Sequence, residues 1–291
     1  MSIHDKAILI SLTLAGIGSA RADKAITSEV LRDHNAQADA GRWLARLWPK
    51  KALEPIRAID ARIRTFHYER SLPWSDRGER MIPARAYTAY IDHMRGLRRE
   101  REQAVQDFID HYDQWISEAR VMRGDSFRSA DYPTRYAAAD RFRMEVAATP
   151  IPSAKDFRVE LSSRDMEEIE DEIATRIQRA TLDAQRALFE RIAAPIAALC
   201  ERLAQPDARI SESTFNALRS VVDAIPDLNA FDDPLLDHLA AEIQAKLLRL
   251  NPDGLQSSRS DRAIALNSAN AILNKMAPWL DDLPDENEDA A

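Results

Sequence analysis

Two long stretches of this chain carry apolar residues at every third or fourth position, and this rhythm restricts the fold more than any other feature. The first stretch runs from Tyr87 to about Gly124, and the second from Ser162 to Pro206. Such spacing places the apolar side chains along one face of an α-helix. Each stretch is long enough for a helix of roughly 60 Å. We therefore expect a mostly α-helical fold built on a long antiparallel coiled-coil hairpin.

The composition agrees with a helical fold. Only 7 of the 291 residues are glycine, whereas alanine, leucine, arginine and glutamate are abundant. These four residue types lose little conformational freedom when they enter a helix. With 45% hydrophobic residues, the chain can bury a substantial core. No apolar run reaches the length of a membrane-spanning helix, so we expect no membrane association.

Breaks in the patterns divide the chain into consecutive segments. Residues 1–26 are expected to form an N-terminal strand and turn, followed by a helical hairpin region over residues 27–206. A small β insert is expected near 141–161, where alternating residues flank Pro150 and Pro152. Residues 207–280 are expected to form a C-terminal helical part, and residues 281–291 a disordered acidic tail.

Local signals refine the helical region. Helices are predicted over 27–48 and over 53–66, with a loop over 72–83 that contains two prolines and a glycine. Pro195 predicts a kink or a break inside the second long helix. On that helix, Ile173 belongs to the apolar stripe, so we expect it to be buried in the hairpin.

The N-terminus allows two interpretations. Residues 7–18 form an apolar run, preceded by Lys6 and followed by Ala20-Arg21-Ala22, which resembles a cleavable signal peptide. The same run alternates with period two, which is typical of a strand, and Asp5 opposes the positive charge of a signal peptide. We favour a strand that completes a three-stranded sheet with the β insert.

The charges are distributed unevenly along the chain. Residues 42–101 contain 15 Lys/Arg and 7 Asp/Glu, whereas residues 205–291 contain 7 Lys/Arg and 16 Asp/Glu. A surplus of eight positive charges within an acidic protein indicates a surface for phosphate groups or for an acidic protein. The candidate binding residues are Lys50, Lys51, Arg57, Arg64, Arg95, Arg98, Arg99 and Arg101.

Two roles are open for these eight residues. Trp43, Trp48, Tyr87 and Tyr90 lie among them, and stacking aromatics together with cations are what single-stranded nucleic acid requires. The alternative is a flank of the coiled coil, in which the cations pair with Glu100, Glu102 and the acidic helix after Ser162. We favour internal pairing, because the aromatic residues also fit the apolar core stripe.

The residues do not indicate an enzyme or a cofactor. The chain lacks the glycine-rich phosphate loops, the nucleophile elbow and the paired-histidine zinc motif. The acidic residues from Glu167 to Glu172 are better explained as the favourable first turns of a helix than as a metal site. Cys200 lies in an apolar run, where an inert buried thiol is expected.

Four stretches carry a resemblance to a known group of proteins. They are residues 8–23, the segment from Leu72-Pro73-Trp74 to Pro83, the arginine-rich helix after Tyr87, and Phe142 through Val159. Together they resemble an uncharacterised family of helical proteins encoded by phages and integrative elements. The resemblance implies an intracellular, cytoplasmic protein and a gene neighbourhood with a MoxR-like AAA ATPase. It carries no assigned activity and no functional residues.

We therefore expect a non-enzymatic interaction or accessory protein of a phage-type system, with no cofactor and a protein partner such as that ATPase. A nucleic-acid-binding accessory factor that uses residues 42–101 is the first alternative. An exported helical protein with a cleaved signal peptide is the second. Self-association into a homo-oligomer is compatible with all three.

Overall fold

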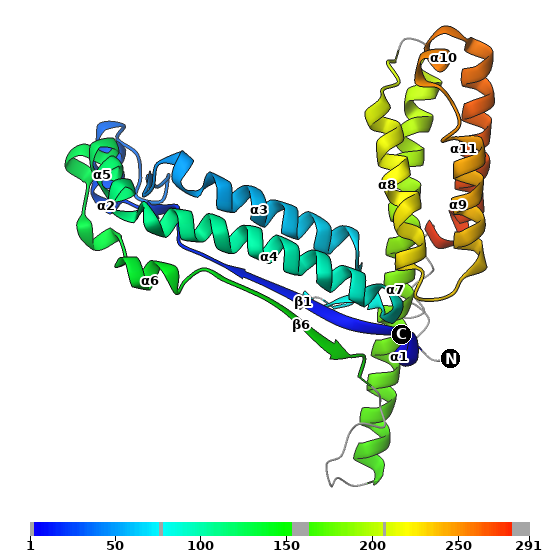
Figure 1. Ribbon diagram of the computed structural model, residues 1–291, viewed down its shortest axis with the longest axis horizontal. Helices are drawn as coiled ribbons and strands as arrows, with labels where there is room; N and C mark the ends of the chain where they lie inside the picture. Colours follow the sequence, from blue (N-terminus) through cyan, green and yellow to red (C-terminus); the bar gives the residue numbers. More distant parts are fainter. Residues whose placement is uncertain (1–2, 76–77, 153–162, 206–207, 281–291) are drawn as a thin grey trace. The chain divides into compact units, whose positions relative to one another are not determined.

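The computed structural model describes residues 3–75, 78–152, 163–205 and 208–280 (Figure 1). The fold is mostly helical, with 69% helix and 11% strand, and it contains a small antiparallel sheet. The chain forms two compact units. Unit 1 contains Met1–Ser11, Tyr68–Ala89 and Ala147–Ala291, and unit 2 contains Leu12–His67 and Tyr90–Val146. The units therefore interleave along the chain, unlike the consecutive segments expected from the sequence.

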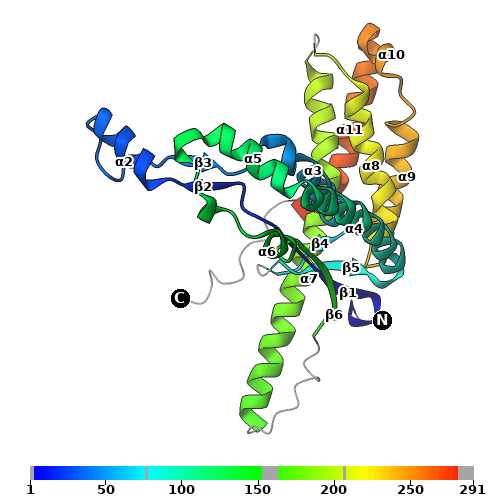
Figure 2. The same cartoon turned by 60° about the vertical axis from the view of Figure 1, so that its left-hand side comes forward.

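The expected N-terminal strand is present. After the short helix α1 (Ile3–Lys6), strand β1 (Ala7–Ala15) pairs antiparallel with β5 (Arg80–Pro83), with Ala7 opposite Pro83 and Ile10 opposite Arg80. The sheet order is β4 (Leu72–Pro73), β5, β1, β6 (Arg143–Pro150). Figures 1 and 2 show β1 and β6 running side by side. The apolar N-terminal run is thus an inner strand of the sheet.

The sheet is built from a different set of strands than expected. The segment 72–83 was predicted to be a loop, but it contains β4 and β5, joined through Gly78 at a φ of 85°. Pro73 and Pro83 stand at strand ends, where a missing N–H is tolerated. The β insert is confirmed by β6, whereas the second expected strand, over 157–161, lies outside the described residues.

Unit 1 is built around a bundle of four helices. They are α7 (Ser163–Ala204), α8 (Glu212–Leu228), α9 (Pro234–Lys246) and α11 (Arg259–Leu280). Their apolar faces meet in one core, whose fully buried members include Ile192, Ile196, Phe215, Ile243 and Ile272. Within the expected C-terminal helical part, the structure has α8, α9 and α11. The short helix α10 (Pro252–Ser257) precedes α11.

Only the second half of α7 belongs to this core. Figure 2 shows the first half of α7 extending beyond α8, α9 and α11, and its apolar stripe, including Ile169, Ile173 and Ile177, is only partly buried. The expectation that Ile173 is buried is therefore wrong. The helix also continues through Pro195 without the predicted break.

Three arginine side chains of unit 1 donate hydrogen bonds to the carbonyl oxygens at the C-terminal ends of three helices. Arg262 on α11 is 6% exposed and donates to four carbonyl oxygens at the end of α7, those of Arg202, Leu203, Gln205 and Ala208. Arg191 donates to the carbonyls of Tyr68, Glu69 and Ser71, where α3 (Lys50–Glu69) ends. Arg85 donates to the carbonyls of Pro226 and Asn229 at the end of α8. Each cation satisfies carbonyls that the helix leaves unpaired.

Unit 2 is organised around an antiparallel helix pair. Helix α3 packs against α4 (Tyr87–Asp110) and α5 (Tyr112–Arg123), which are separated at His111. The antiparallel direction follows from the ion pairs Arg62–Glu100 and Lys51–Glu118. Trp48, Leu53, Ile56, Phe108 and Tyr112 lie in the core between these helices. The short helix α6 (Arg135–Ala139) contributes Ala138 to it.

The structure does not confirm the expected coiled-coil hairpin. The two long periodic stretches belong mainly to different units, because α4 is in unit 2 from Tyr90 onward and α7 is in unit 1. The second half of helix α7 buries its apolar stripe against α8 and α11, and α4 buries its own against α3. Periodicity identified both helices correctly but did not specify which faces would pair.

The predicted helix over 27–48 is only partly correct. Helix α2 spans Lys24–Asp33 and is capped by Asp23, whose carboxylate accepts hydrogen bonds from the N–H groups of Ala25 and Ile26. Asn35 adopts a φ of 49°, a left-handed conformation that ends the helix. The chain then returns as β3 (Leu44–Arg46), which pairs with β2 (Ala20–Ala22).

Ile192→Asp is expected to unfold unit 1, because Ile192 is 0% exposed in its core. Burying an unpaired carboxylate there should cost about 3 kcal/mol or more. Ile173→Asp on the same helix is the matched control and should cost less than about 1 kcal/mol, because its side chain is partly exposed. Urea unfolding followed by hydrogen exchange over α8 and α11 measures both costs. Equal costs for the two variants would contradict the assigned core.

Candidate functional site

The uneven charge of the sequence maps onto the two units. Unit 2 contains 20 Lys/Arg and 17 Asp/Glu, a net charge of +3, whereas unit 1 contains 20 Lys/Arg and 31 Asp/Glu, a net charge of −11. All eight candidate binding residues lie in unit 2, on α3 and α4. The basic surface predicted from these eight residues therefore belongs to unit 2.

Half of the eight candidates have an acidic neighbour within unit 2. Lys51 donates to Glu118 at 3.0 Å, and Arg95 pairs with Asp92 at 2.8 Å. Lys50 lies 3.9 Å from Glu54. Arg101 is 3% exposed and bonds to Asp60 at 2.6 Å. These four pairs are local to unit 2 and do not involve the acidic helix after Ser162, which is α7 in unit 1.

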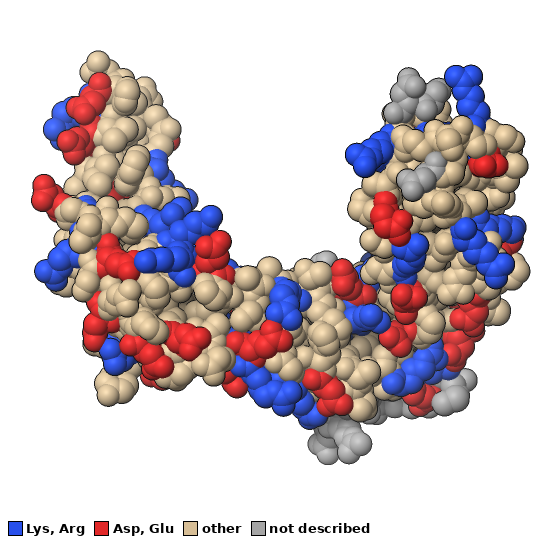
Figure 3. All heavy atoms as spheres, turned by 45° about the horizontal axis from the view of Figure 1, so that its top comes forward, with Lys and Arg blue, Asp and Glu red and all other residues tan. Residues whose placement is uncertain are grey.

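The other four candidates are Arg57, Arg64, Arg98 and Arg99. None of them forms an ion pair or a side-chain hydrogen bond with a residue that the structure describes. Arg57, Arg64 and Arg99 are exposed, whereas the Nε of Arg98 is buried without an acceptor. Figure 3 shows Lys/Arg and Asp/Glu side chains intermixed over the face it presents, with no uninterrupted basic area.

The aromatic residues expected to accompany the cations have different surroundings. Trp48 and Tyr90 are each 2% exposed, and Trp48 packs edge-on against Phe108 and Tyr132. Tyr87 is partly buried in unit 1. Trp43 alone of the four is half exposed, at 50%. Buried rings cannot stack on bases, so the structure does not bring the predicted cations and aromatics together.

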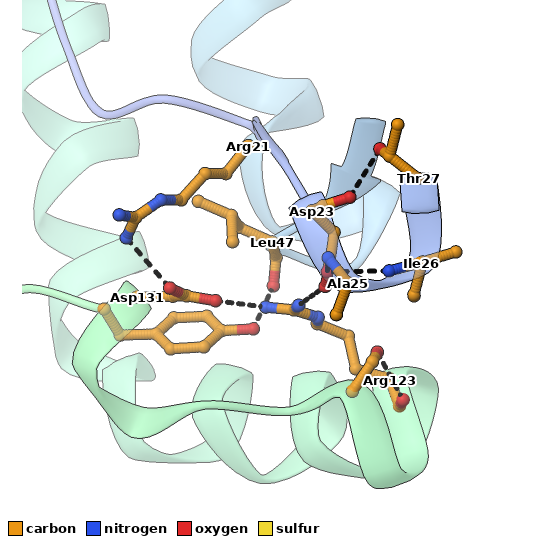
Figure 4. Close-up of polar contacts among 10 residues, drawn as sticks. Arg21, Asp23, Ala25, Ile26, Thr27, Leu47, Arg123 and Asp131 are labelled. Carbon is orange, nitrogen blue, oxygen red and sulfur yellow. Dashed lines mark hydrogen bonds and ion pairs between the residues drawn. The ribbon is translucent and has the colours of Figure 1, made fainter. Parts of the chain in front are cut away.

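A buried ion cluster holds the β2–β3 end of unit 2 against α5. The Arg123 side chain is 5% exposed and donates to Asp131 at 2.8 Å and to Asp23 at 3.4 Å (Figure 4). Arg21 donates to the second oxygen of Asp131, and Asp23 is also the cap of α2. The cluster therefore joins the start of α2 to the end of α5.

The electrostatics of the cluster are those of a structural anchor. Burial alone would lower the pKa of Arg123, but its hydrogen bonds to Asp131 and Tyr132 raise it, so the side chain stays charged. Burial raises the pKa of Tyr132, which donates to the carbonyl of Leu47. Burial likewise raises the pKa of Tyr112 to about 12. None of these groups changes its protonation near neutral pH, which excludes them as acid–base catalysts there.

An apolar groove lies beside the cluster, between α2 and the chain that returns from it. We call it the α2 groove. It has a volume of about 250 Å³ and is lined by Thr27, Val30, Leu31, His34, Ala36, Ala40, Gly41, Arg42 and Trp43. Its apolar lining remains accessible, because Val30 is 40% exposed and Trp43 is 50% exposed. No residue of α2 is buried.

Hydrogen bonds fix the α2 groove even though its apolar face is uncovered. The N–H of Trp43 donates to the Thr27 hydroxyl at 2.9 Å, and the Trp43 carbonyl accepts from the N–H of Asp23 at 3.0 Å. At the other end of α2, the N–H of Ala36 donates to the carbonyl of Leu31 at 2.8 Å. The Trp43 backbone is thus fastened while its indole stays exposed.

The described residues give little support for metal binding, a reactive thiol or a membrane-spanning helix. The described residues contain no group of three or more His, Cys, Asp or Glu side chains placed to hold a metal ion. Burial raises the pKa of the Cys200 thiol, which keeps it protonated and unreactive. Within the described residues, no helix combines the length and the apolar character that crossing a membrane requires.

Sequence analysis missed the α2 groove because it assigned residues 27–48 to one helix. The signal was present in residues 35–42, which contain no large apolar side chain and end just after Gly41. A helix with a packed face would carry apolar residues through such a stretch. Trp43 was therefore counted among the aromatics of a basic stripe, rather than as the wall of a groove.

Fold and site together define a two-unit helical protein with an exposed apolar groove on unit 2. Comparisons with protein-family models, with curated proteins and with solved structures find no match to this chain. The resemblance to helical phage-encoded proteins therefore stays a prediction.

Arg123→Met is expected to destabilise unit 2 by about 3 kcal/mol, because it leaves the buried carboxylates of Asp23 and Asp131 without their shared cation. Arg128→Met is the matched control. Arg128 lines a cavity next to the ion cluster, together with Arg123 and Asp131, but its side chain is exposed. Hydrogen exchange over α5 and β3 in increasing urea measures the difference. If both variants open at the same urea concentration, Arg123 is not an anchor.

Proposed function

We propose that this chain is a non-enzymatic interaction protein that binds a protein partner through the α2 groove. The observation that carries the proposal is Trp43, whose backbone is fixed on both sides while its indole lines an uncovered apolar groove. Tryptophan dominates binding energies at protein interfaces, and pre-organised side chains lose little entropy when a partner docks.

The physical state of α2 supports this assignment. A helix of ten residues is marginal in water unless its apolar face packs against something. Here, the end caps and the Trp43 backbone hold α2 in place, and Ile26, Val30 and Leu31 remain partly or largely exposed. A partner that covers this face would supply the missing packing.

The partner's identity rests on the resemblance alone. A MoxR-like AAA ATPase is the first protein to test, as a component of the same mobile element, and a cytoplasmic location is part of this proposal. A second copy of the chain is a further candidate occupant, which would make the protein a homo-oligomer.

Trp43→Ala is expected to weaken partner binding by about 30-fold, equivalent to the roughly 2 kcal/mol of an interface hot spot. Tyr136→Ala is the matched control, because Tyr136 is an 83% exposed aromatic residue of unit 2 outside the groove. Affinity capture from nuclease-treated host extract, quantified by mass spectrometry, should recover a protein with wild type and Tyr136→Ala but not with Trp43→Ala. Light scattering over a range of concentrations tests self-association. Equal recovery by all three chains would reject the groove as the interface.

Nucleic-acid binding is the second candidate function, and the unpaired Arg57, Arg64, Arg98 and Arg99 are the observation that favours it. The burial of Trp48 and Tyr90 and the intermixed charges argue against it. We therefore propose nucleic-acid binding only as the alternative. Without aromatic stacking, the arginines would contact phosphates alone, and such binding is weak and depends on salt.

The triple change Arg95, Arg98, Arg99→Ala tests this alternative. If these arginines contact phosphates, each lost contact should reduce the slope of log K against log salt by about 0.9 on duplex and about 0.7 on single strands. We expect weak or no binding by the wild type in a low-salt titration. A submicromolar complex with single-stranded DNA or RNA that the triple variant loses would promote nucleic-acid binding to the main function.

The exported alternative would require cleavage after Ala22, which would remove β1 from between β5 and β6. Stability argues for retaining these residues, because an inner strand pairs on both sides. We therefore do not favour this alternative.

A further inference from the structure

A second groove lies in unit 2, away from α2, and its charge is not balanced. It has a volume of about 330 Å³ between α3 and the end of β1. We call it the Arg57–Arg64 groove. One wall is α3, with Leu53, Ile56, Arg57, Asp60 and Arg64, and the other is the segment Leu14–Gly18 together with Phe142.

Helical geometry places three charged residues of α3 in this groove. Arg57, Asp60 and Arg64 are spaced by three and four residues, so they share one face of the helix. On an isolated helix, Asp60 would pair with either arginine. The two arginines are two turns apart, roughly 10 Å along the helix axis.

Asp60 pairs with Arg101 instead of with Arg57 or Arg64. The Arg101 side chain is 4% exposed, donates to Asp60 at 2.6 Å and donates to the carbonyl of Ala15 at 2.7 Å. Arg101 is therefore held between α3 and β1 and cannot leave without breaking its hydrogen bonds to two partly buried acceptors. The groove lining contains two guanidinium groups, Arg57 and Arg64, and one carboxylate, Asp60, which Arg101 neutralises from outside the lining.

Two further acids on α3 and α4 have other basic partners. Glu54 lies 3.9 Å from Lys50, and Glu100 pairs with Arg62 at 2.6 Å. Arg57 and Arg64 have no ion pair or hydrogen bond with any residue in the described part of the chain. Both are exposed, so their guanidinium groups are free to turn towards a ligand.

The opposite wall of the groove has glycine backbone that a ligand can approach closely. Gly16 packs against Phe142, and a Cβ at position 16 would lie 3.2 Å from the ring. Gly16 and Gly18 are exposed, so their backbone presents no side chain to the groove. Leu14, Ile17 and Phe142 give this wall an apolar surface. The groove thus offers two separated cations beside an apolar wall.

We propose that the Arg57–Arg64 groove binds a small organic ligand that carries two oxyanion groups, one for each arginine. The guanidinium fork matches both phosphate and carboxylate oxygens, and the apolar wall accommodates the carbon skeleton between them. This binding is independent of the α2 groove, which has different walls.

Calorimetric titration of the full chain at low salt tests the proposal with three probes: the bisphosphate ester of hexanediol, the dicarboxylate suberate, and inorganic phosphate. One or both of the two-ended probes should bind, and inorganic phosphate should bind more weakly. Tighter binding of the bisphosphate identifies phosphate as the natural group, and tighter binding of suberate identifies carboxylate.

The variants Arg57→Gln and Arg64→Gln should each weaken binding by about tenfold or more, as expected for a lost charge-assisted hydrogen bond. Arg62→Gln removes the same charge from α3 but pairs with Glu100 outside the groove lining, so it should change the affinity less than about twofold. Circular dichroism confirms that the variants are folded. Absence of binding by both two-ended probes, equal binding of inorganic phosphate, or an equal loss in Arg62→Gln would overturn the proposal.

Discussion

Both units depend on arginine side chains that donate hydrogen bonds to carbonyl and carboxylate oxygens. Arg262, Arg191 and Arg85 satisfy the last carbonyls of α7, α3 and α8. Arg123 and Arg101 do the same for carboxylates and for a β1 carbonyl in unit 2. Helix ends and strand ends carry backbone acceptors that water would otherwise have to reach. A guanidinium group suits this role because its five donors form a planar fork that keeps its charge when buried. With 11% strand in the fold, side chains rather than sheet ladders connect many of the segments.

This use of arginine changes the meaning of the basic segment. A surplus of cations in the sequence predicts a binding surface only if the cations remain free. In the structure, Arg62, Arg70, Arg80, Arg85, Arg95 and Arg101 from residues 42–101 all have acidic or carbonyl partners. The cations that stay unpaired are therefore more informative than the total. Arg57 and Arg64 are unpaired because Arg101, a buried neighbour, occupies the carboxylate between them. An internal structural bond thus creates the free charge at the surface.

The sequence predicted what depends on local spacing and missed what depends on distant partners. Periodicity identified α3, α4 and α7, because a helix places its apolar stripe by its own geometry. The start of α9 is also set locally, because Asp233 caps the helix and Pro234 stands at its first position. In contrast, the pairing of β5 with β1 joins residues at least seventy positions apart, and nothing local to Arg80–Pro83 specifies it. The choice of α8 and α11 as neighbours of α7 is likewise set by the whole core of unit 1. For the candidate sites, composition indicated the right region of the chain, but only the contacts separated Arg57 and Arg64 from the paired cations.

Each of the two grooves lacks one kind of interaction, and the missing kind differs between them. In the α2 groove, polar bonds are complete and apolar packing is missing, since the caps and the Trp43 backbone are satisfied while Val30 and the indole are exposed. In the Arg57–Arg64 groove, the apolar residues Leu53 and Ile56 are buried and the charge is left unbalanced. Neither the missing apolar packing nor the unbalanced charge stabilises the folded state, because exposed apolar surface and uncompensated charge both cost free energy. A ligand that supplied the missing term would gain that free energy as binding energy. Because the two deficits differ in kind, we propose different ligands for the two grooves, an apolar protein surface in one case and an organic dianion in the other.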